Sequence, residues 1–222
     1  MRYLILFALF LLPNAAFAVT YATWNSADKS ASVSLSGGDL TATKTTSDGW
    51  AGVRSTISKS SGKWYWEVTM TVLSAPNTAG HFFGVANSSY NFNGDASTGN
   101  VTAFQNGQGG YFECTTTETS GYGNGDADDV YGIALDKDGG EIDVYRNDVL
   151  LKNCTSLPSG DTYAMWSAYK NTDSAITNFG ASAFVYTPPS GYEAGLCDTA
   201  PCTATAETII PILSLVRAFW IW

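Results

Sequence analysis

The stretch that decides the fold is "SGKWYWEV", residues 61–68, which places three aromatic side chains in consecutive positions. On a β-strand, alternate side chains point to opposite faces of the sheet. One face would then carry Trp64, Trp66, Val68 and Met70, and the other Lys63, Tyr65, Glu67 and Thr69. Bulky apolar side chains in register are typical of the core of a two-sheet sandwich rather than of a ligand platform. We therefore expect Trp64 and Trp66 to be buried, and the pattern leaves Tyr65 undecided.

The same period of two recurs along the chain, whereas helical periodicity is nearly absent. It is seen in "ASVSLS" at 31–36, "GHFFGVA" at 80–86 and "EIDVYRNDVLL" at 141–151. Clusters rich in Gly, Asn and Asp separate these runs, such as "NFNGD" at 91–95, "NGQGG" at 106–110 and "DKDGG" at 136–140. Such clusters supply the left-handed conformations that tight turns need. The pattern predicts an all-β, antiparallel sandwich or barrel.

The first eighteen residues differ from the rest of the chain. Arg2 gives a short basic start, residues 4–12 form an unbroken apolar run, and Ala16-Phe17-Ala18 has the small-x-small pattern of a signal-peptidase site. We predict that residues 1–18 are a secretory signal and that the mature chain begins near Val19. The expected location is therefore secreted, periplasmic or at the cell surface.

Length, composition and charge limit the remaining possibilities. A chain of 222 residues, 45% hydrophobic and 14% charged, fits one globular domain with extensions. The formal net charge is -9, and loss of Arg2 with the signal leaves ten basic against twenty acidic residues. This acidity argues against nucleic acid or an anionic membrane as partner of the folded part.

The four cysteines, Cys114, Cys154, Cys197 and Cys202, are expected to form disulfides in an oxidising compartment. Three connectivities are possible. We favour Cys114 with Cys154, which flank one sheet-like stretch, and Cys197 with Cys202, which lie close together near the C-terminus. A zinc site is unfavourable because the paired C-x-x-C spacing is absent and His81 is the one histidine.

Several segments in continuous order resemble one family. Besides "SGKWYWEV", they are "FFGVANSSYNF" at 82–92, "GNGDADDVYGIALDKDGGEIDVYRNDVLL" at 123–151 and "ITNFGASAFVYTPPSGY" at 176–192. Together they resemble SPRY domains over residues 45–192, and the last is especially similar to SPRY modules of bacterial and bacteriophage proteins. The resemblance implies a bent, jelly-roll-type sandwich of two antiparallel sheets, similar to the concanavalin A scaffold. It also implies a binding module without catalytic apparatus or cofactor, which holds its partner by variable loops. We place this domain at residues 19–196.

Enzymatic and metal sites are poorly supported by the residues. "EIDVYR" approaches the paired-acid strand of glucan hydrolases, but Arg146 stands where the second catalytic carboxylate should be, so a solvated hairpin explains Glu141 and Asp143 better. His81 lies in "TAGHFFG" without a nucleophile motif and is interpreted as a strand-entry residue. The loop "GNGDADD" has alternate oxygen-bearing side chains but lacks the glycine and glutamate of an EF-hand, so turn chemistry is favoured over calcium.

Two loops offer the best material for a partner site. The loop at 87–100 carries Tyr90, Phe92 and Asn93 among Ser and Gly residues, and the loop at 119–126 carries Tyr122. Exposed aromatic rings beside adaptable amides suit protein and sugar ligands alike. The alternative, that a given ring plugs the end of the sandwich, is about equally compatible with the sequence. The expected partner is a protein, or in a lectin-like alternative a surface glycan, bound through Tyr90, Phe92, Asn93 and Tyr122.

The chain ends in a tail, residues 197–222, that contains the apolar run "ETIIPILSLVRAFWIW". As a helix from Thr208 this run would extend only about 22 Å, short of a bilayer, and Pro211 and Arg217 interrupt it. An interfacial anchor, a sorting or assembly tail, and a truncated or frameshifted reading frame are all compatible with it. Any membrane contact is expected through this tail alone.

Overall fold

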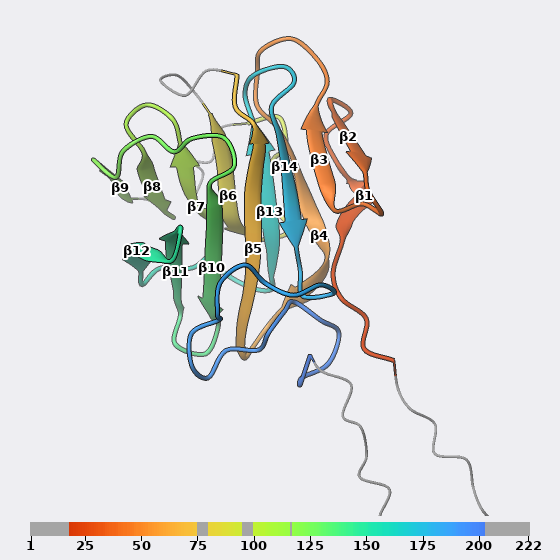
Figure 1. Cartoon of the computed structure of the whole chain (residues 1–222), viewed down its shortest axis with the longest axis vertical. Helices are drawn as coiled ribbons and strands as arrows, with labels where there is room; N and C mark the ends of the chain where they lie inside the picture. Colours follow the sequence, from red (N-terminus) through yellow and green to blue (C-terminus); the bar gives the residue numbers. More distant parts are fainter. Residues whose placement is uncertain (1–17, 75–79, 95–99, 116, 203–222) are drawn as a thin grey trace, which may run out of the picture.

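The computed structural model describes residues 18–74, 80–94, 100–115 and 117–202, and these form a sandwich of two antiparallel sheets (Figure 1). The predicted all-β, two-sheet class is confirmed. Residues 1–17 of the proposed signal, and residues 203–222 of the tail with its apolar run, lie outside the described residues.

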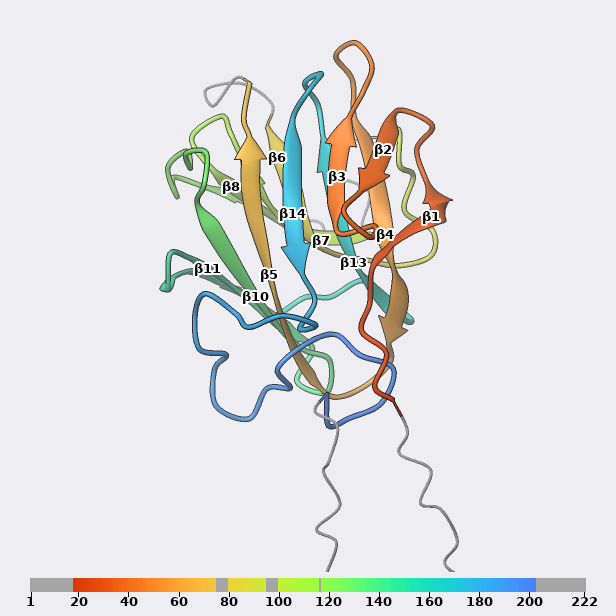
Figure 2. The ribbon, with the colours of Figure 1, turned by 45° about the vertical axis from the view of Figure 1, so that its right-hand side comes forward.

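Each sheet has seven strands. Sheet I has the order β1-β4-β13-β6-β7-β8-β9, formed by Trp24–Lys29, Ala51–Lys59, Thr162–Ala168, His81–Ala86, Val101–Asn106, Tyr111–Cys114 and Thr117–Ser120. Sheet II has the order β12-β11-β10-β5-β14-β3-β2, formed by Val149–Cys154, Glu141–Arg146, Val130–Asp136, Lys63–Val72, Ser174–Asn178, Thr41–Lys44 and Val33–Ser36. The long strand β5 carries the deciding stretch, and it lies between β10 and β14 near the centre of sheet II (Figure 2).

The core lies between the two sheets. Trp64, Trp66, Val68 and Met70 of β5 all point into it, with exposed fractions of 5% or less. Trp24 and Trp166 from sheet I meet them there, together with Phe83 of β6, Phe104 of β7 and Phe112 of β8. The prediction that Trp64 and Trp66 are buried is therefore confirmed, and alternation along one strand was sufficient to assign them.

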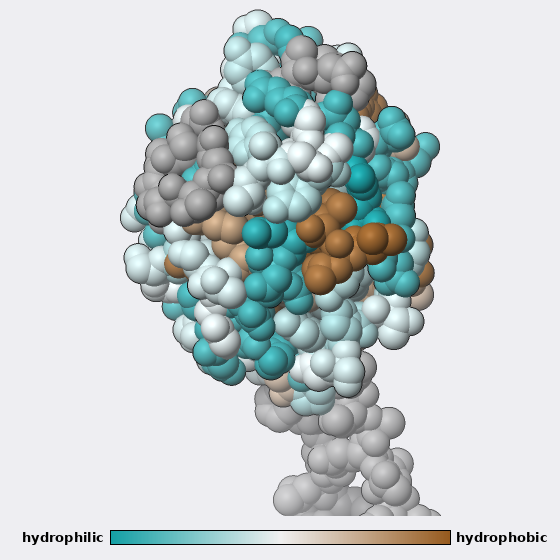
Figure 3. All heavy atoms as spheres, turned by 90° about the vertical axis from the view of Figure 1, so that its left-hand side faces the viewer, coloured by the Kyte–Doolittle hydropathy of each residue, from teal (hydrophilic) through white to brown (hydrophobic). Residues whose placement is uncertain are grey.

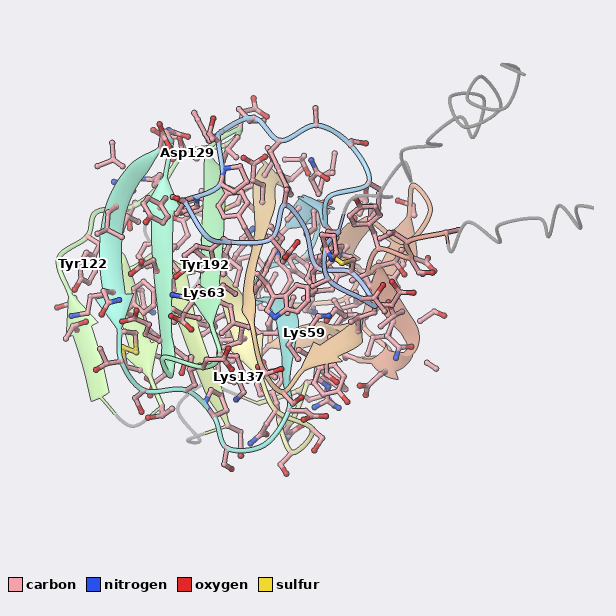
Figure 4. All side chains as sticks on the ribbon, turned by 90° about the horizontal axis from the view of Figure 1, so that it is seen from below. Lys59, Lys63, Tyr122, Asp129, Lys137 and Tyr192 are labelled. Carbon is pink, nitrogen blue, oxygen red and sulfur yellow. A yellow bond between two sulfur atoms is a disulfide. The ribbon has the colours of Figure 1, made fainter. Side chains whose placement is uncertain are left out.

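The outer face of sheet II is partly covered by the segment that follows β14. Tyr65 points to this face, yet it is 2% exposed because Phe184 packs edge-on against it, with ring centroids 5.1 Å apart. Glu67 accepts hydrogen bonds from the backbone N–H groups of Val185 and Tyr186, both at 2.8 Å. In the view of Figure 4, Tyr192 from this segment lies beside Lys63 of β5, and the Lys63 ammonium is 5.5 Å from the Tyr192 ring centroid. The segment is thus an integral part of the fold.

Both favoured cysteine pairs are at disulfide distance. Cys114 at the end of β8 pairs with Cys154 at the end of β12, with Cα atoms 5.9 Å apart. This bridge joins the two sheets where β8 and β9 face β11 and β12, on the left of Figure 1. Cys197 pairs with Cys202, with Cα atoms 5.6 Å apart. The predicted connectivity is supported for both pairs.

The two ends of the described chain are joined by a small clasp. Residues 20–22 run beside residues 196–198: Ala22 N donates to Leu196 O at 2.8 Å, and Asp198 N donates to Thr20 O at 2.9 Å. The Tyr21 hydroxyl donates to the backbone carbonyl of Cys202, which is one partner of the Cys197–Cys202 disulfide. Both ends therefore leave the sandwich at one pole, the lower one in Figure 1.

The side of the molecule that carries the edge strands β9 and β12, on the left of Figure 1, has a small apolar patch (Figure 3). On the edge strand β12, Val149 and Leu150 are 64% and 50% exposed. A few exposed apolar side chains at a strand edge are common on protein surfaces. Among the residues that the structure describes, no helix has the length and apolar character needed to cross a membrane.

The ion pair between Lys63 and Asp136 of sheet II makes the free energy of unfolding depend on pH in the acidic range. Burial alone would raise the pKa of Asp136, but the Lys63 ammonium at 2.6 Å and the Gly139 N–H at 2.7 Å outweigh it and hold that pKa below its ordinary value. A carboxyl group with a depressed pKa stabilises the folded state above its unfolded pKa of ~3.9, and this contribution is lost as the pH falls through the folded pKa.

The free energy of unfolding of the wild type should fall as the pH drops below about 4. We expect this fall to be smaller in Lys63→Met. The effect will be modest because the Lys63 side chain is 46% exposed and solvent screens the pair. Urea unfolding at a series of pH values measures it, with Lys152→Met as a control for removal of one positive charge. An acid profile unchanged by Lys63→Met would contradict the assignment.

Candidate functional site

The loop predicted to carry the site folds back onto the outer face of sheet I. The Tyr90 ring is 4% exposed and belongs to a second apolar cluster, separate from the core between the sheets. Its ring centroid is 5.8 Å from that of Phe92, which is half-buried against the same cluster. Of the two alternatives, burial therefore holds for Tyr90, and Phe92 keeps a partly accessible ring.

An arginine fixes this loop to the sheet. Arg54 of β4 is 6% exposed, and its Nε and Nη2 donate to the two carboxylate oxygens of Asp28 at 2.8 and 2.9 Å. Its Nη1 donates to the Asn87 carbonyl at 2.5 Å. The guanidinium also lies 4.8 Å from the Phe92 centroid and 5.3 Å from that of Tyr163. A planar cation with five donors suits such a combination of ion pair and ring contacts.

The amides of the same loop are used within the fold. Asn93 is exposed, but its Oδ1 accepts from the Ser30 hydroxyl at 2.7 Å. Asn91 Oδ1 accepts from Asn93 N at 3.1 Å, and Asn87 Oδ1 accepts from Ser89 N at 2.9 Å. These are turn contacts of the Asx type. They reduce the number of amides that this loop can offer to a sugar.

Tyr122 lies elsewhere. It is half-buried and packs against the core between the sheets, with its ring 6.3 Å from that of Phe104 and 6.2 Å from that of Phe112. Its hydroxyl donates to Thr119 Oγ1 at 3.2 Å. Tyr90, Phe92 and Asn93 are therefore brought together, but Tyr122 is on the inner side of sheet I and does not join them. Figure 4 shows its position at the margin of the sandwich.

The residues that sequence reasoning missed form one row across sheet I. Strand pairing places Ser167 of β13 opposite Phe82 of β6, Phe82 opposite Gln105 of β7, and Gln105 opposite Tyr111 of β8. Gly52 of β4 continues the row beyond Ser167. We call these five residues the cross-strand row. Their neighbours in sequence fill the core, so the row points to the outer face of sheet I.

Aromatic side chains surround the row. The ring of Trp50 lies 4.7 Å from that of Phe82 and 5.4 Å from that of Tyr169, and Tyr111 meets Phe82 edge-on at 5.8 Å. Phe82 is 1% exposed, whereas Trp50, Tyr111 and Tyr169 are only half-buried. Two residues from Phe82 and Gln105, just beyond the ends of β6 and β7, the chain has Gly80 and Gly107, which add no side chains. The outer face of sheet I thus presents half-exposed rings around a buried floor.

Comparison with solved structures decides the fold. The chain superposes on the SPRY domain of human HERC1 with a TM-score of 0.57 at 14% identity, over 69% of this chain and 96% of that one. It superposes on the PSpry domain of TRIM65 with a TM-score of 0.59 at 13% identity, over 71% of this chain and 92% of that one. The chain has the SPRY fold. No protein-family model matches the sequence, and no curated protein matches it.

The acidic pair that approaches a hydrolase motif is engaged within this SPRY fold. The Asn153 amide on β12 donates to Glu141 Oε2 at 3.1 Å and to Asp143 Oδ1 at 2.7 Å. The "GNGDADD" loop is likewise engaged within the fold, because Asp126 N donates to Asp129 Oδ2 at 2.9 Å and Gly109 N, from a neighbouring loop, donates to Asn124 Oδ1 at 2.7 Å. In the described part of the chain, no three His, Cys, Asp or Glu side chains are grouped so that they could hold a metal ion.

His81 is the first residue of β6 and is part of a buried network of this SPRY fold. Its Nδ1 accepts from Trp166 Nε1 at 3.0 Å, which places the proton of the neutral ring on Nε2. Nε2 lies 3.1 Å from the Val72 carbonyl and 3.4 Å from Asp173 Oδ2. The network ties β6 to β13 and to the end of β5. The interpretation of His81 as a strand-entry residue agrees with this position.

Proposed function

We propose that the chain is an exported, non-catalytic binding module that captures a protein partner on the outer face of sheet I. Export is supported by the signal-like residues 1–18 and by two cysteine pairs at disulfide distance. We further propose that residues 19–196 form the domain and that it is a SPRY module of the bacterial or bacteriophage type. The solved SPRY domains support the fold on which this proposal is built.

A single observation carries the choice of surface. One apolar cluster fills the core between the sheets. A second apolar cluster lies on the outer face of sheet I and is bordered by Trp50, Phe92 and Tyr111. Half-exposed aromatic rings around a desolvated centre are typical of binding hot spots. The loop of Tyr90, Phe92 and Asn93 would then form one border of the site, and Tyr122 would lie outside it.

We expect Trp50→Ala with Tyr111→Ala to weaken binding at least about tenfold, because truncation of aromatic anchors removes most of the contact energy. The measurement is a pull-down of cell-surface protein and surface glycan fractions with the full mature chain from Val19, followed by titration of the captured partner.

The matched control changes apolar residues of another surface, Val149→Ser with Leu150→Ser on β12. Capture of one protein that the Trp50/Tyr111 variant loses and the β12 variant keeps would support the proposal. Loss with both variants, or with neither, would exclude this face. Capture of glycan alone would favour the lectin-like alternative, and circular dichroism establishes that each variant is folded.

A further inference from the structure

Two buried polar side chains of the cross-strand row have no use in the fold. Gln105 is 1% exposed, and among the described residues neither its Oε1 nor its Nε2 has a hydrogen-bond partner. Ser167 is 0% exposed, and its Oγ is equally without a partner there. Buried polar groups are nearly always paired, and an unpaired one destabilises the protein. The two groups therefore point to a partner outside the fold.

The chemistry of Gln105 defines what could pair with it. A carboxamide presents one acceptor oxygen and one donor nitrogen side by side. Its complement is another amide, which offers an N–H and a C=O, as each residue of a peptide main chain does. The Ser167 hydroxyl can donate or accept and pairs equally well with a main-chain group.

The spacing of the two groups suits an extended chain. Gln105 and Ser167 lie on either side of Phe82, each on a strand adjacent to β6. Neighbouring strands are ~4.8 Å apart, so the two positions are about 10 Å apart. An extended peptide advances ~3.3 Å per residue and covers this distance in about three residues. A peptide crossing the strands could reach both groups and lay an intervening side chain against the floor.

The charges near the row indicate an uncharged ligand. Arg54 is paired with Asp28 at 2.8 Å, and Lys170 is paired with Asp48. No ionic group of these pairs is left to recognise a charged ligand, and the Glu113 side chain, two residues beyond Tyr111 on the same face of β8, is 2% exposed and engaged within the fold. A glycan would present many hydroxyl groups, whereas the row offers it two unpaired polar side chains set between aromatic rings.

We propose that the cross-strand row binds an extended, uncharged peptide segment through its main-chain amides. Gln105 pairs with the N–H and C=O of one peptide residue, and Ser167 pairs with a main-chain group about three residues away. The half-exposed rings of Trp50 and Tyr111 rotate to admit the segment and pack against its side chains. This assignment rests on the proposed function and names the class of partner.

The test is a selection of displayed twelve-residue peptides on the full mature chain, followed by titration with Gln105→Leu. We expect the selected peptides to bind Gln105→Leu at least tenfold more weakly. The same variant should melt at an equal or higher temperature, because it removes an unpaired buried polar group. Thr177→Val is the matched control, since Thr177 is also buried and unpaired but faces away from the site.

Replacing single peptide amides by esters separates direct binding by Gln105 from a structural role. If Gln105 only supported the fold, an ester would change the affinity of the wild type and of Gln105→Leu alike. One ester should weaken binding to the wild type and have no effect on Gln105→Leu. Equal binding to both proteins, or a lower melting temperature of Gln105→Leu, would overturn the assignment. If the wild type selects peptides that Trp50→Ala/Tyr111→Ala loses but Gln105→Leu keeps, only this assignment fails. If the wild type selects no peptide but the pull-down captures a protein that Trp50→Ala/Tyr111→Ala loses, only this assignment fails; if the pull-down captures no protein either, the protein-binding function fails as well.

Discussion

Replacing Cys114 and Cys154 together by alanine is expected to lower the free energy of unfolding by about 4 kcal/mol. The bridge closes a loop with a sequence separation of 40, and the chain-entropy model gives about this value for such a loop. It also joins β8 of sheet I to β12 of sheet II, where no other covalent link holds the described edges together. We expect faster amide hydrogen exchange in β8 and β12 before any change in β5.

Urea unfolding under oxidising conditions measures this loss. The matched control is the Cys197→Ala/Cys202→Ala variant, whose bridge spans a separation of only 5 and should contribute nearer to 2 kcal/mol. Equal losses for the two variants would contradict the loop-length explanation. No loss for the longer bridge would show that this pair is not oxidised in the folded protein.

Removing the carboxylate of Glu67 is the second change with a large expected effect. Glu67 is 2% exposed and accepts from the N–H groups of Val185 and Tyr186 and from the Tyr65 hydroxyl, the last at 3.2 Å. Glu67→Ala leaves these donors without their acceptor, which costs about 3 kcal/mol or more in all. We also expect residues 183–186 to detach from sheet II and become accessible to protease.

Glu141→Ala is the control for Glu67→Ala. Glu141 is also an acid on the outer face of sheet II, but its carboxylate accepts from an exposed Asn153 amide, so its loss should cost less than about 1 kcal/mol. Chemical unfolding and hydrogen exchange at Val185 and Tyr186 distinguish the two variants. Unchanged exchange at these amides in Glu67→Ala would show that the segment is held by Phe184 packing rather than by the carboxylate.

Local patterns predicted which way side chains point but not what covers them. Alternation in β5 correctly sent Trp64 and Trp66 to the core. The same alternation assigned Tyr65 and Glu67 to the outer face, yet both are buried, because the covering segment comes from more than a hundred residues further along the chain. Coverage of a sheet face is a long-range property, and period-two patterns carry no information about it.

The candidate site was missed for a related reason. Ser167, Phe82, Gln105 and Tyr111 come from four strands and meet only through strand register. One local signal was present but was interpreted as period-two alternation: "HFFGVA" of β6 in fact lacks the apolar-polar alternation of a half-exposed antiparallel strand, and all its residues are buried. Such a strand implies cover on both faces of the sheet. That signal predicts a second apolar cluster outside sheet I, although it does not identify its members.

The clasp of residues 20–22 with residues 196–198 has a mechanical consequence. Because the two ends of the sandwich lie side by side, tension applied to them in opposite directions is borne first by these few hydrogen bonds, and the strands of both sheets stay unloaded. The same arrangement lets the whole sandwich be grafted into a surface loop of another protein at a single point of attachment. A domain joined in this way projects with its opposite pole outermost.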